Sequence, residues 1–136
     1  MRIFLDATIL FSAAKSNGAV RVFLEKLRAL GHILVANGYV MGEARRNLEA
    51  KFPSALVDFD ALIHNVESSG NSCRPLGKEI VPSLPEKYRP VLAAAIHLRC
   101  QILLTGDKTH FGPLCGQTIA GVHVHSPASL AAHLLP

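Results

Sequence analysis

Short apolar runs and longer periodic segments alternate along this chain. The short runs are rich in isoleucine, leucine and valine and are too brief for helices, which is typical of buried strands. The expected strands cover residues 2–5, Ile33–Ala36, 101–104 and Val122–His125, and a further short one is expected over Cys73–Leu76.

The segments between these runs place apolar residues every three or four positions, which indicates helices that pack by one face. Gly31 is suited to end the first helix and Ser126 to cap the last. Pro53 and Pro90 suit the first turns of two others. The expected helices cover Ala19–Leu30, about 39–50, about 54–67, Pro90 to about Arg99, and the residues from Pro127 onward.

Glycine, proline and small polar residues interrupt these patterns and predict the connections. They predict a turn at Asn37-Gly38, a loop over 68–72, an irregular surface segment over 77–87, and a turn at His110–Pro113 after a short helix. Strands and helices alternate throughout. This favours an α/β fold, with a parallel sheet covered by helices on both faces, in a single domain of residues 1–136.

Composition and charge narrow the class of protein. The chain is 49% hydrophobic and 18% charged, which suits a globular core. No apolar run reaches the roughly 18–20 residues that cross a bilayer, and an acid at position 6 interrupts any leader-like start. A cytoplasmic protein is expected, with its three cysteines as free thiols. The net charge of +4 favours polyanionic partners only weakly.

Three acids are candidates for chemistry. Asp6 and Asp107 each follow an apolar strand, and Glu43 is expected in the first turn after the second strand. The carboxyl ends of parallel strands share one edge, so the three carboxylates would meet there. Such a group suits Mg²⁺ or Mn²⁺, which can activate water in phosphodiester hydrolysis. Taken singly, the aspartates could be helix N-caps and Glu43 a favourable contact with a helix start.

Other polar residues lie near this edge in sequence. The hydroxyls of Thr8 and Thr105 could hold a carboxylate or a metal-bound water, or they could cap the local backbone. Basic side chains could bind phosphates or simply be solvated. These basic candidates are Arg45, Arg46, Lys87, Arg89 and Lys108. His123 and His125 would share a strand face, but no third ligand stands near them to make a metal site.

The chain resembles the PIN-domain family, in particular the toxins of bacterial and archaeal toxin–antitoxin pairs. The resemblance covers nearly the whole chain and rests on the order and spacing of three pieces. These are Leu5-Asp6-Ala7-Thr8-Ile9-Leu10, Glu43-Ala44-Arg45-Arg46-Asn47-Leu48, and Pro90–Ile96 leading to Leu103-Leu104-Thr105-Gly106-Asp107-Lys108-Thr109-His110-Phe111.

The resemblance implies a sheet of about five strands in the order 3-2-1-4-5, with Asp6 beside Asp107 at the topological switch point. It also implies cleavage of single-stranded RNA with Mg²⁺ or Mn²⁺, a homodimer, and often a small antitoxin partner. Asp6, Glu43 and Asp107 match acids that hold the metal in this family.

One position departs from the family pattern. Tyr88 stands where the family usually has an aspartate before the Pro90 helix, and a phenol is a poor Mg²⁺ ligand. Glu86, two residues away, is a candidate substitute. The leading hypothesis is a metal-dependent endoribonuclease. The alternatives are a catalytically impaired PIN-like module that binds RNA or protein, and a phosphotransfer domain, which Thr8 disfavours because phosphatases of that type have a second aspartate there.

Overall fold

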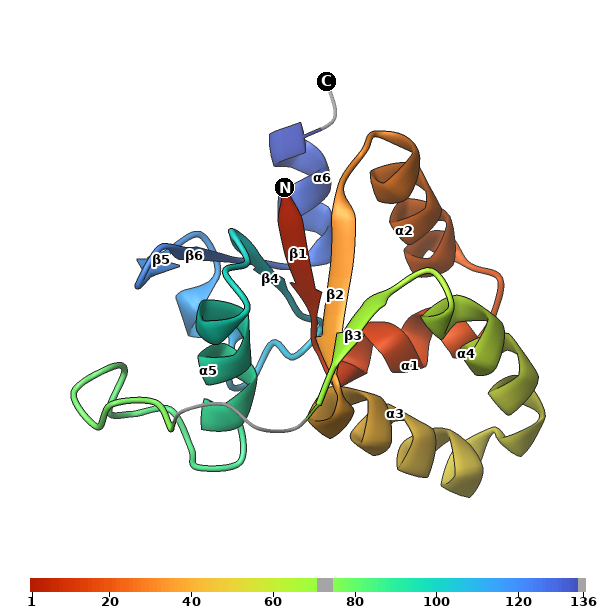
Figure 1. The fold of residues 1–136 in the computed structure, drawn as a ribbon, viewed down its shortest axis with the longest axis horizontal. Helices are drawn as coiled ribbons and strands as arrows, with labels where there is room; N and C mark the ends of the chain where they lie inside the picture. Colours follow the sequence, from red (N-terminus) through yellow and green to blue (C-terminus); the bar gives the residue numbers. More distant parts are fainter. Residues whose placement is uncertain (71–74, 135–136) are drawn as a thin grey trace.

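One six-stranded sheet, in the order β3-β2-β1-β4-β6-β5, organises the computed structural model, which describes residues 1–70 and 75–134 (Figure 1). Five neighbouring strands run parallel, namely β3, β2, β1, β4 and β6. The edge strand β5 is antiparallel to its neighbour β6. The strands are β1 (Arg2–Leu5), β2 (Ile33–Asn37), β3 (Glu67–Ser69), β4 (Ile102–Leu104), β5 (Thr118–Ile119) and β6 (Val122–His125). The expected α/β class and the expected order of the five parallel strands are confirmed.

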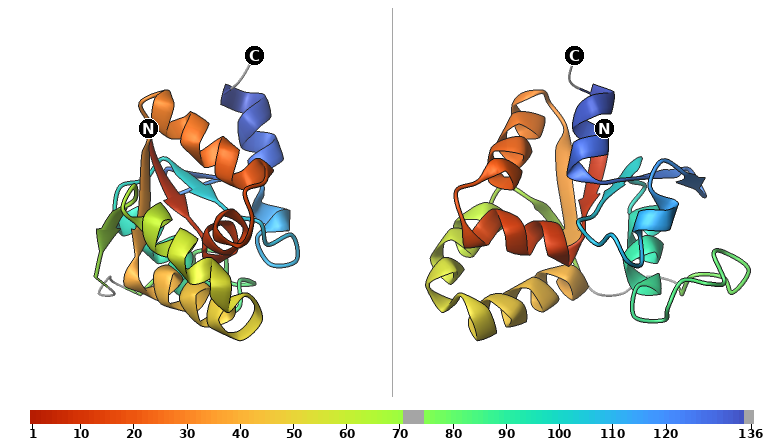
Figure 2. Two further views of the ribbon diagram at one scale, coloured as in Figure 1. Left: turned by 90° about the vertical axis from the view of Figure 1, so that its right-hand side faces the viewer. Right: turned by 180° about the vertical axis from the view of Figure 1, so that it is seen from behind.

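Helices cover both faces of this sheet (Figures 1 and 2). Helix α5 lies on one face, and α1, α2 and α6 lie on the other. The helices are α1 (Ala7–Lys15), α2 (Ala19–Ala29), α3 (Gly38–Lys51), α4 (Leu56–Ile63), α5 (Arg89–His97) and α6 (Pro127–Leu134), with 3-10 turns at Pro53–Ala55 and Gly112–Leu114. In the described part of the chain, every helix is too short or too polar to reach across a lipid bilayer.

Helix ends follow the residues that cap them. Gly31 has a φ of +91° directly after α2, a conformation that glycine adopts without strain. The Ser126 hydroxyl accepts a hydrogen bond from the backbone N–H of Ser129 at 3.1 Å and so caps α6. Asn37 caps α3 by accepting from the Val40 N–H at 3.1 Å. The expected turn at Asn37-Gly38 is therefore wrong, because Asn37 ends the strand and starts the helix at once.

Several expected boundaries are also wrong. The helix expected to reach residue 67 ends at Ile63, and β3 occupies residues that were expected to begin a loop. Cys73 and Arg74 of the expected third strand lie outside the described residues, and Pro75 and Leu76 are irregular. No helix lies between β4 and His110, which is in a turn, so the expected short helix there is wrong. Helix α1 covers a segment to which no element was assigned.

The order of the strands fixes where a ligand can bind. Connections from β1 move outward to β2 and β3, whereas β4 lies on the other side of β1. The register pairs Leu5 with Leu104, so both strands end side by side. A backbone hydrogen bond of 3.0 Å from the Asp6 N–H to the Leu104 carbonyl extends this pairing. The switch point therefore places the residues after β1 and β4 next to each other.

Candidate active site

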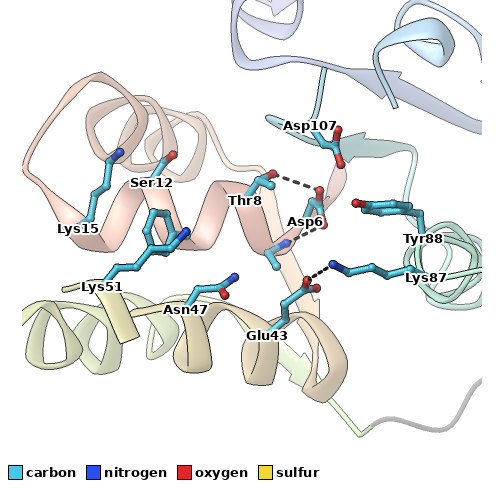
Figure 3. Close-up of a pocket in the computed structure, with 12 residues that line it drawn as sticks. Asp6, Thr8, Ser12, Lys15, Glu43, Asn47, Lys51, Lys87, Tyr88 and Asp107 are labelled. Atoms are coloured by element: carbon cyan, nitrogen blue, oxygen red, sulfur yellow. Dashed lines mark hydrogen bonds and ion pairs between the residues drawn. The ribbon is translucent and has the colours of Figure 1, made fainter. Parts of the chain in front are cut away.

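A cavity of about 390 Å³ opens at this switch point (Figure 3). Asp6, Glu43 and Asp107 all line it, although they come from three separate connections in the chain. Glu43 lies in the second turn of α3, not the first, because the helix begins at Gly38. Asp107 follows β4, and Asp6 lies between β1 and α1. The structure thus gathers the three acids in one pocket.

Asp6 is the most buried of the three acids, with 4% of its surface exposed. Its Oδ1 accepts from the Ala7 N–H at 2.7 Å, which caps α1. Its Oδ2 accepts from the hydroxyls of Thr105 at 2.7 Å and Thr8 at 3.1 Å. Burial raises the pKa of Asp6, which these three hydrogen bonds lower in part and Glu43 raises further.

The two threonines form a bracket around the Asp6 carboxylate. Thr8 Oγ1 accepts from the Gly106 N–H at 2.9 Å, and Thr105 Oγ1 accepts from the Asp107 N–H at 3.1 Å. Each hydroxyl therefore donates to Asp6 and accepts from the segment after β4. These threonines therefore support the Asp6 carboxylate and also satisfy nearby backbone N–H groups, so two of the expected roles occur together.

Asp107 is held by its own turn. Its Oδ1 accepts from the N–H groups of Thr109 and His110, both at 3.0 Å, and its Oδ2 lies 3.1 Å from His110 Nδ1. Partial burial acts to raise the pKa of Asp107, but the hydrogen bonds from His110 and Thr109 outweigh it and the pKa is lowered. His110 was not among the sequence candidates, and no local pattern distinguished it from the other histidines.

Tyr88 lies in the pocket with its hydroxyl directed toward the aspartates (Figure 3). Its ring stacks on His110 with centroids 4.1 Å apart and meets the edge of Phe111 at 5.7 Å. Burial and the nearby Asp107 raise the pKa of Tyr88, so the hydroxyl is a hydrogen-bond donor at neutral pH. Tyr39 donates to the Lys87 carbonyl at 2.8 Å and anchors this segment on α3.

The basic side chains at the pocket differ from those expected. Lys87 lines it, and Lys87 Nζ lies 3.7 Å from Glu43 Oε1. Lys15 and Lys51 also line it, together with Phe11, Ser12 and Asn47, and none of these five was a candidate. Each of the two lysines comes last in its helix, so no local sequence signal linked it to the acids.

Four of the predicted basic residues do not line the pocket. Arg45 pairs with Asp60 at 2.6 Å, and its role in binding phosphate stays a prediction. Arg89 is buried and donates to the carbonyls of Val81, Gly77 and Ile80 at 2.7–3.0 Å, so the prediction that it binds phosphate is wrong. The other two are exposed outside the lining: Arg46 and Lys108.

Glu86 is exposed and does not line the pocket, so its position does not compensate for Tyr88. His123 and His125 hydrogen-bond to Thr118 and Ser129 at 2.7 and 2.9 Å. Within residues 1–70 and 75–134, no three side chains of the His, Cys, Asp or Glu type are grouped tightly enough to hold one metal ion. The three pocket acids thus share a cavity without forming a closed set of ligands.

The chain matches no family model and no curated protein. It is similar to a chain of VapBC2 from Rickettsia felis, solved with a DNA fragment from its promoter, at 16% identity and a TM-score of 0.68, covering 93% of this chain and 98% of that one. Mycobacterium tuberculosis VapC20, a toxin that cleaves the sarcin–ricin loop, matches at 13% identity and a TM-score of 0.56, covering 82% and 94%.

VapBC-1 from nontypeable Haemophilus influenzae matches at 12% identity and a TM-score of 0.59, covering 94% of this chain and 99% of that one. Identities this low establish the fold alone. The structural matches nevertheless extend over most of each chain, so the likeness is between whole domains and is not limited to a shared βαβ unit. The chain therefore has the PIN-type fold of the VapC toxins, as its motifs predicted.

Proposed function

We propose that this chain is a metal-dependent endoribonuclease that hydrolyses single-stranded RNA, and that it is the toxin of a toxin–antitoxin pair. The observation that carries the proposal is the convergence of Asp6, Glu43 and Asp107 in one cavity at the switch point of a PIN-type sheet. The likeness in fold to VapC20, a toxin that cleaves an RNA loop, supports the same activity.

The acids fit a hard divalent cation. An ionised carboxylate offers about four acceptor sites, and Asp6 uses three of them on Ala7, Thr8 and Thr105. Asp107 likewise has three close partners from its own turn. One or two carboxylates plus waters are a usual shell for Mg²⁺, so one remaining acceptor site on each aspartate is enough. We assign the ion to Asp6 and Asp107, with Glu43 completing or orienting its shell.

Each pocket residue has a separate role in the proposed hydrolysis. When bound, Mg²⁺ or Mn²⁺ would polarise the phosphate and lower the pKa of water. The threonine bracket keeps Asp6 oriented toward the cavity, and the hydrogen bonds from its turn keep Asp107 ionised. Lys87 attracts the phosphate, and the Tyr88 hydroxyl donates a hydrogen bond to it. The water loses a proton to solvent as its oxygen forms a bond to phosphorus. The bond from phosphorus to the leaving ribose oxygen breaks, and that oxygen takes up a proton from solvent, so one water is consumed for each bond cut.

Tyr88 favours a second candidate function, a PIN-like module that binds RNA or a protein partner without cutting. The phenol supplies a donor where a carboxylate would supply an acceptor, and no other acid replaces it in the lining. A weaker cation site follows from the loss of one negative oxygen ligand. The nuclease remains our first proposal because Asp6, Glu43 and Asp107 all line the cavity.

The wider setting belongs to the same proposal. Two of the similar chains come from VapBC structures, in which a toxin is paired with its antitoxin. We propose an antitoxin partner for this chain on the strength of that likeness. The resemblance to the PIN-domain toxins suggests a homodimer, and the composition of the chain suggests a cytoplasmic location.

Cleavage of a mixed pool of single-stranded RNA, with Mn²⁺ or with a chelator, tests the nuclease. The wild type should produce fragments only with the metal, and Asp6→Asn, which keeps the shape of the side chain, should not. Equal background from both proteins would refute catalysis by this site.

Two variants at Tyr88 then separate the candidates. Tyr88→Asp restores the carboxylate of the family pattern, and Tyr88→Phe removes only the hydroxyl while keeping the stack on His110. If the wild type is silent and Tyr88→Asp cleaves, the native chain is a binding module. If the wild type cleaves and Tyr88→Phe is slower, the phenol takes part in the reaction.

A further inference from the structure

The cavity at the switch point has two electrostatically different ends. The acids and Tyr88 lie at one end, and Lys15 and Lys51 lie at the other (Figure 3). Phe11 is close to both lysines, with its ring centroid 5.6 Å from Lys15 Nζ and 5.9 Å from Lys51 Nζ. Two ammonium groups from different helices therefore converge on one half-buried ring.

The position of each lysine has a simple local explanation, but their convergence does not. Lys15 ends α1 and Lys51 ends α3, where a positive charge interacts favourably with the helix dipole. That interaction would be satisfied equally well if the side chains pointed apart into water. Neither ammonium group forms an ion pair with a carboxylate in residues 1–70 and 75–134. Their positive charge is thus available to a ligand.

We propose that Lys15 and Lys51 form a phosphate subsite, which holds a backbone phosphate of the RNA strand beyond the one that is cut. Ser12 and Asn47 line the cavity on the same two helices and offer hydroxyl and amide donors there. The ring of Phe11 holds the two ammonium groups through cation–π contacts, and an anion between them offsets their mutual repulsion. The inference rests on the proposed function, because it assumes that the strand enters the acidic end.

Helix geometry gives the spacing between the two ends. Thr8, which touches Asp6, and Lys15 are seven residues apart on α1, a rise of about 10 Å at 1.5 Å per residue. Glu43 and Lys51 are eight residues apart on α3, a rise of about 12 Å. A base-stacked strand advances about 3.4 Å per nucleotide, so the subsite lies about three nucleotides from the scissile phosphate, or fewer if the strand is stretched.

The salt dependence of RNA binding tests this subsite. All proteins carry Asp6→Asn so that no strand is cut, and the probe is a fluorescent 12-nucleotide single-stranded RNA. Each phosphate contact contributes about 0.7 to the slope of log K against log salt. Lys15→Ala/Lys51→Ala should reduce the slope by about 0.7 if the lysines share one phosphate, and should weaken binding about fivefold at 0.1 M salt.

A matched control separates the subsite from a general effect of charge. Lys26 and Lys78 are exposed and lie outside the cavity lining, so Lys26→Ala/Lys78→Ala removes the same charge elsewhere. It should keep the parental slope.

Equal slopes for the two double variants with the longer RNA, or no RNA binding by any of these proteins, would overturn the inference. A failure of the proposed function would give a different result. In that case the wild-type protein would not cleave RNA, although the two double variants would still differ in slope.

Discussion

Replacing Thr105 with valine tests the bracket that positions Asp6. Thr105 is 1% exposed, and its hydroxyl donates to Asp6 Oδ2 at 2.7 Å while accepting from the Asp107 N–H at 3.1 Å. Valine has nearly the same shape but no hydroxyl. Thr105→Val therefore removes both hydrogen bonds and leaves the surrounding packing almost unchanged.

The free energy of unfolding should fall by about 2.5–4 kcal/mol in Thr105→Val. A hydrogen bond to a charged group contributes about 1.5–3 kcal/mol, and leaving the Asp107 N–H without its acceptor adds about 1 kcal/mol. Thr105→Ser is the control, since it keeps the hydroxyl and loses one buried methyl group, at about 0.8 kcal/mol. Because hydrogen bonds to the ionised form favour it, losing one should also raise the pKa of Asp6 further.

Urea denaturation at pH 7 measures these differences, provided that the three proteins have the same m-value. A double-mutant cycle with Asp6→Asn isolates the part that depends on the Asp6 charge. If Thr105→Val is no less stable than Thr105→Ser, the hydroxyl does not support Asp6 and the geometry of the site described above is wrong.

Two other changes have clear expected outcomes. The pKa of Asp6 is raised in the folded state, so folding binds a proton and stability falls as pH rises from the unfolded value of about 3.9 through the folded value. Urea titrations from pH 3 to 8 should therefore show that Asp6→Asn is more stable than wild type at pH 7 and that the difference narrows as the pH falls. An Asp6→Asn variant that is less stable than wild type at pH 7 would contradict this. Arg89→Leu leaves three backbone carbonyls without their donor, so the free energy of unfolding should fall by about 2–4 kcal/mol. Hydrogen exchange should become faster over residues 77–81, and exchange in the rest of the chain serves as the internal control.

The strands of the sheet interior could be predicted because their burial leaves a mark in the sequence. Ile3, Phe4 and Leu5 are fully buried, as are Leu103 and Leu104, and such unbroken apolar runs are what a parallel sheet requires. The two aspartates directly after these strands then fell at the switch point. Asp6 and Asp107 could thus be placed in one site from strand ends alone.

The edge strands could not be predicted in this way. Strand β3 reads Glu67-Ser68-Ser69, which is polar because it lies at the sheet edge, and β5 has only two residues. Helix α1 was missed for a different reason. Its buried residues, Ala7, Ile9, Leu10, Ala13 and Ala14, lie on one face of the helix, but three of these five are alanines and the helix has only nine residues, so its apolar period is a weak signal in the sequence.

The basic residues of the site were mostly missed because tertiary contacts decide them. Arg89 is adjacent to Tyr88 in sequence, yet it turns inward to bind the segment over 77–81. Lys15 and Lys51 are far from the acids in sequence and reach the same cavity through the packing of α1 against α3. Nearness in sequence to a candidate acid was therefore a poor guide to nearness in space.

Asp6 could be a helix cap and nothing more, but its surroundings favour a functional role. Asparagine or serine would cap α1 as well as aspartate does, without placing a charge in a site that raises its pKa. The hydroxyls of Thr8 and Thr105 both donate hydrogen bonds to the Asp6 carboxylate. Capping of α1 does not need these two bonds, because the Ala7 N–H already provides the capping contact. A buried acid that weakens the fold, yet is surrounded by donors that keep it charged, is the arrangement that a cation site requires.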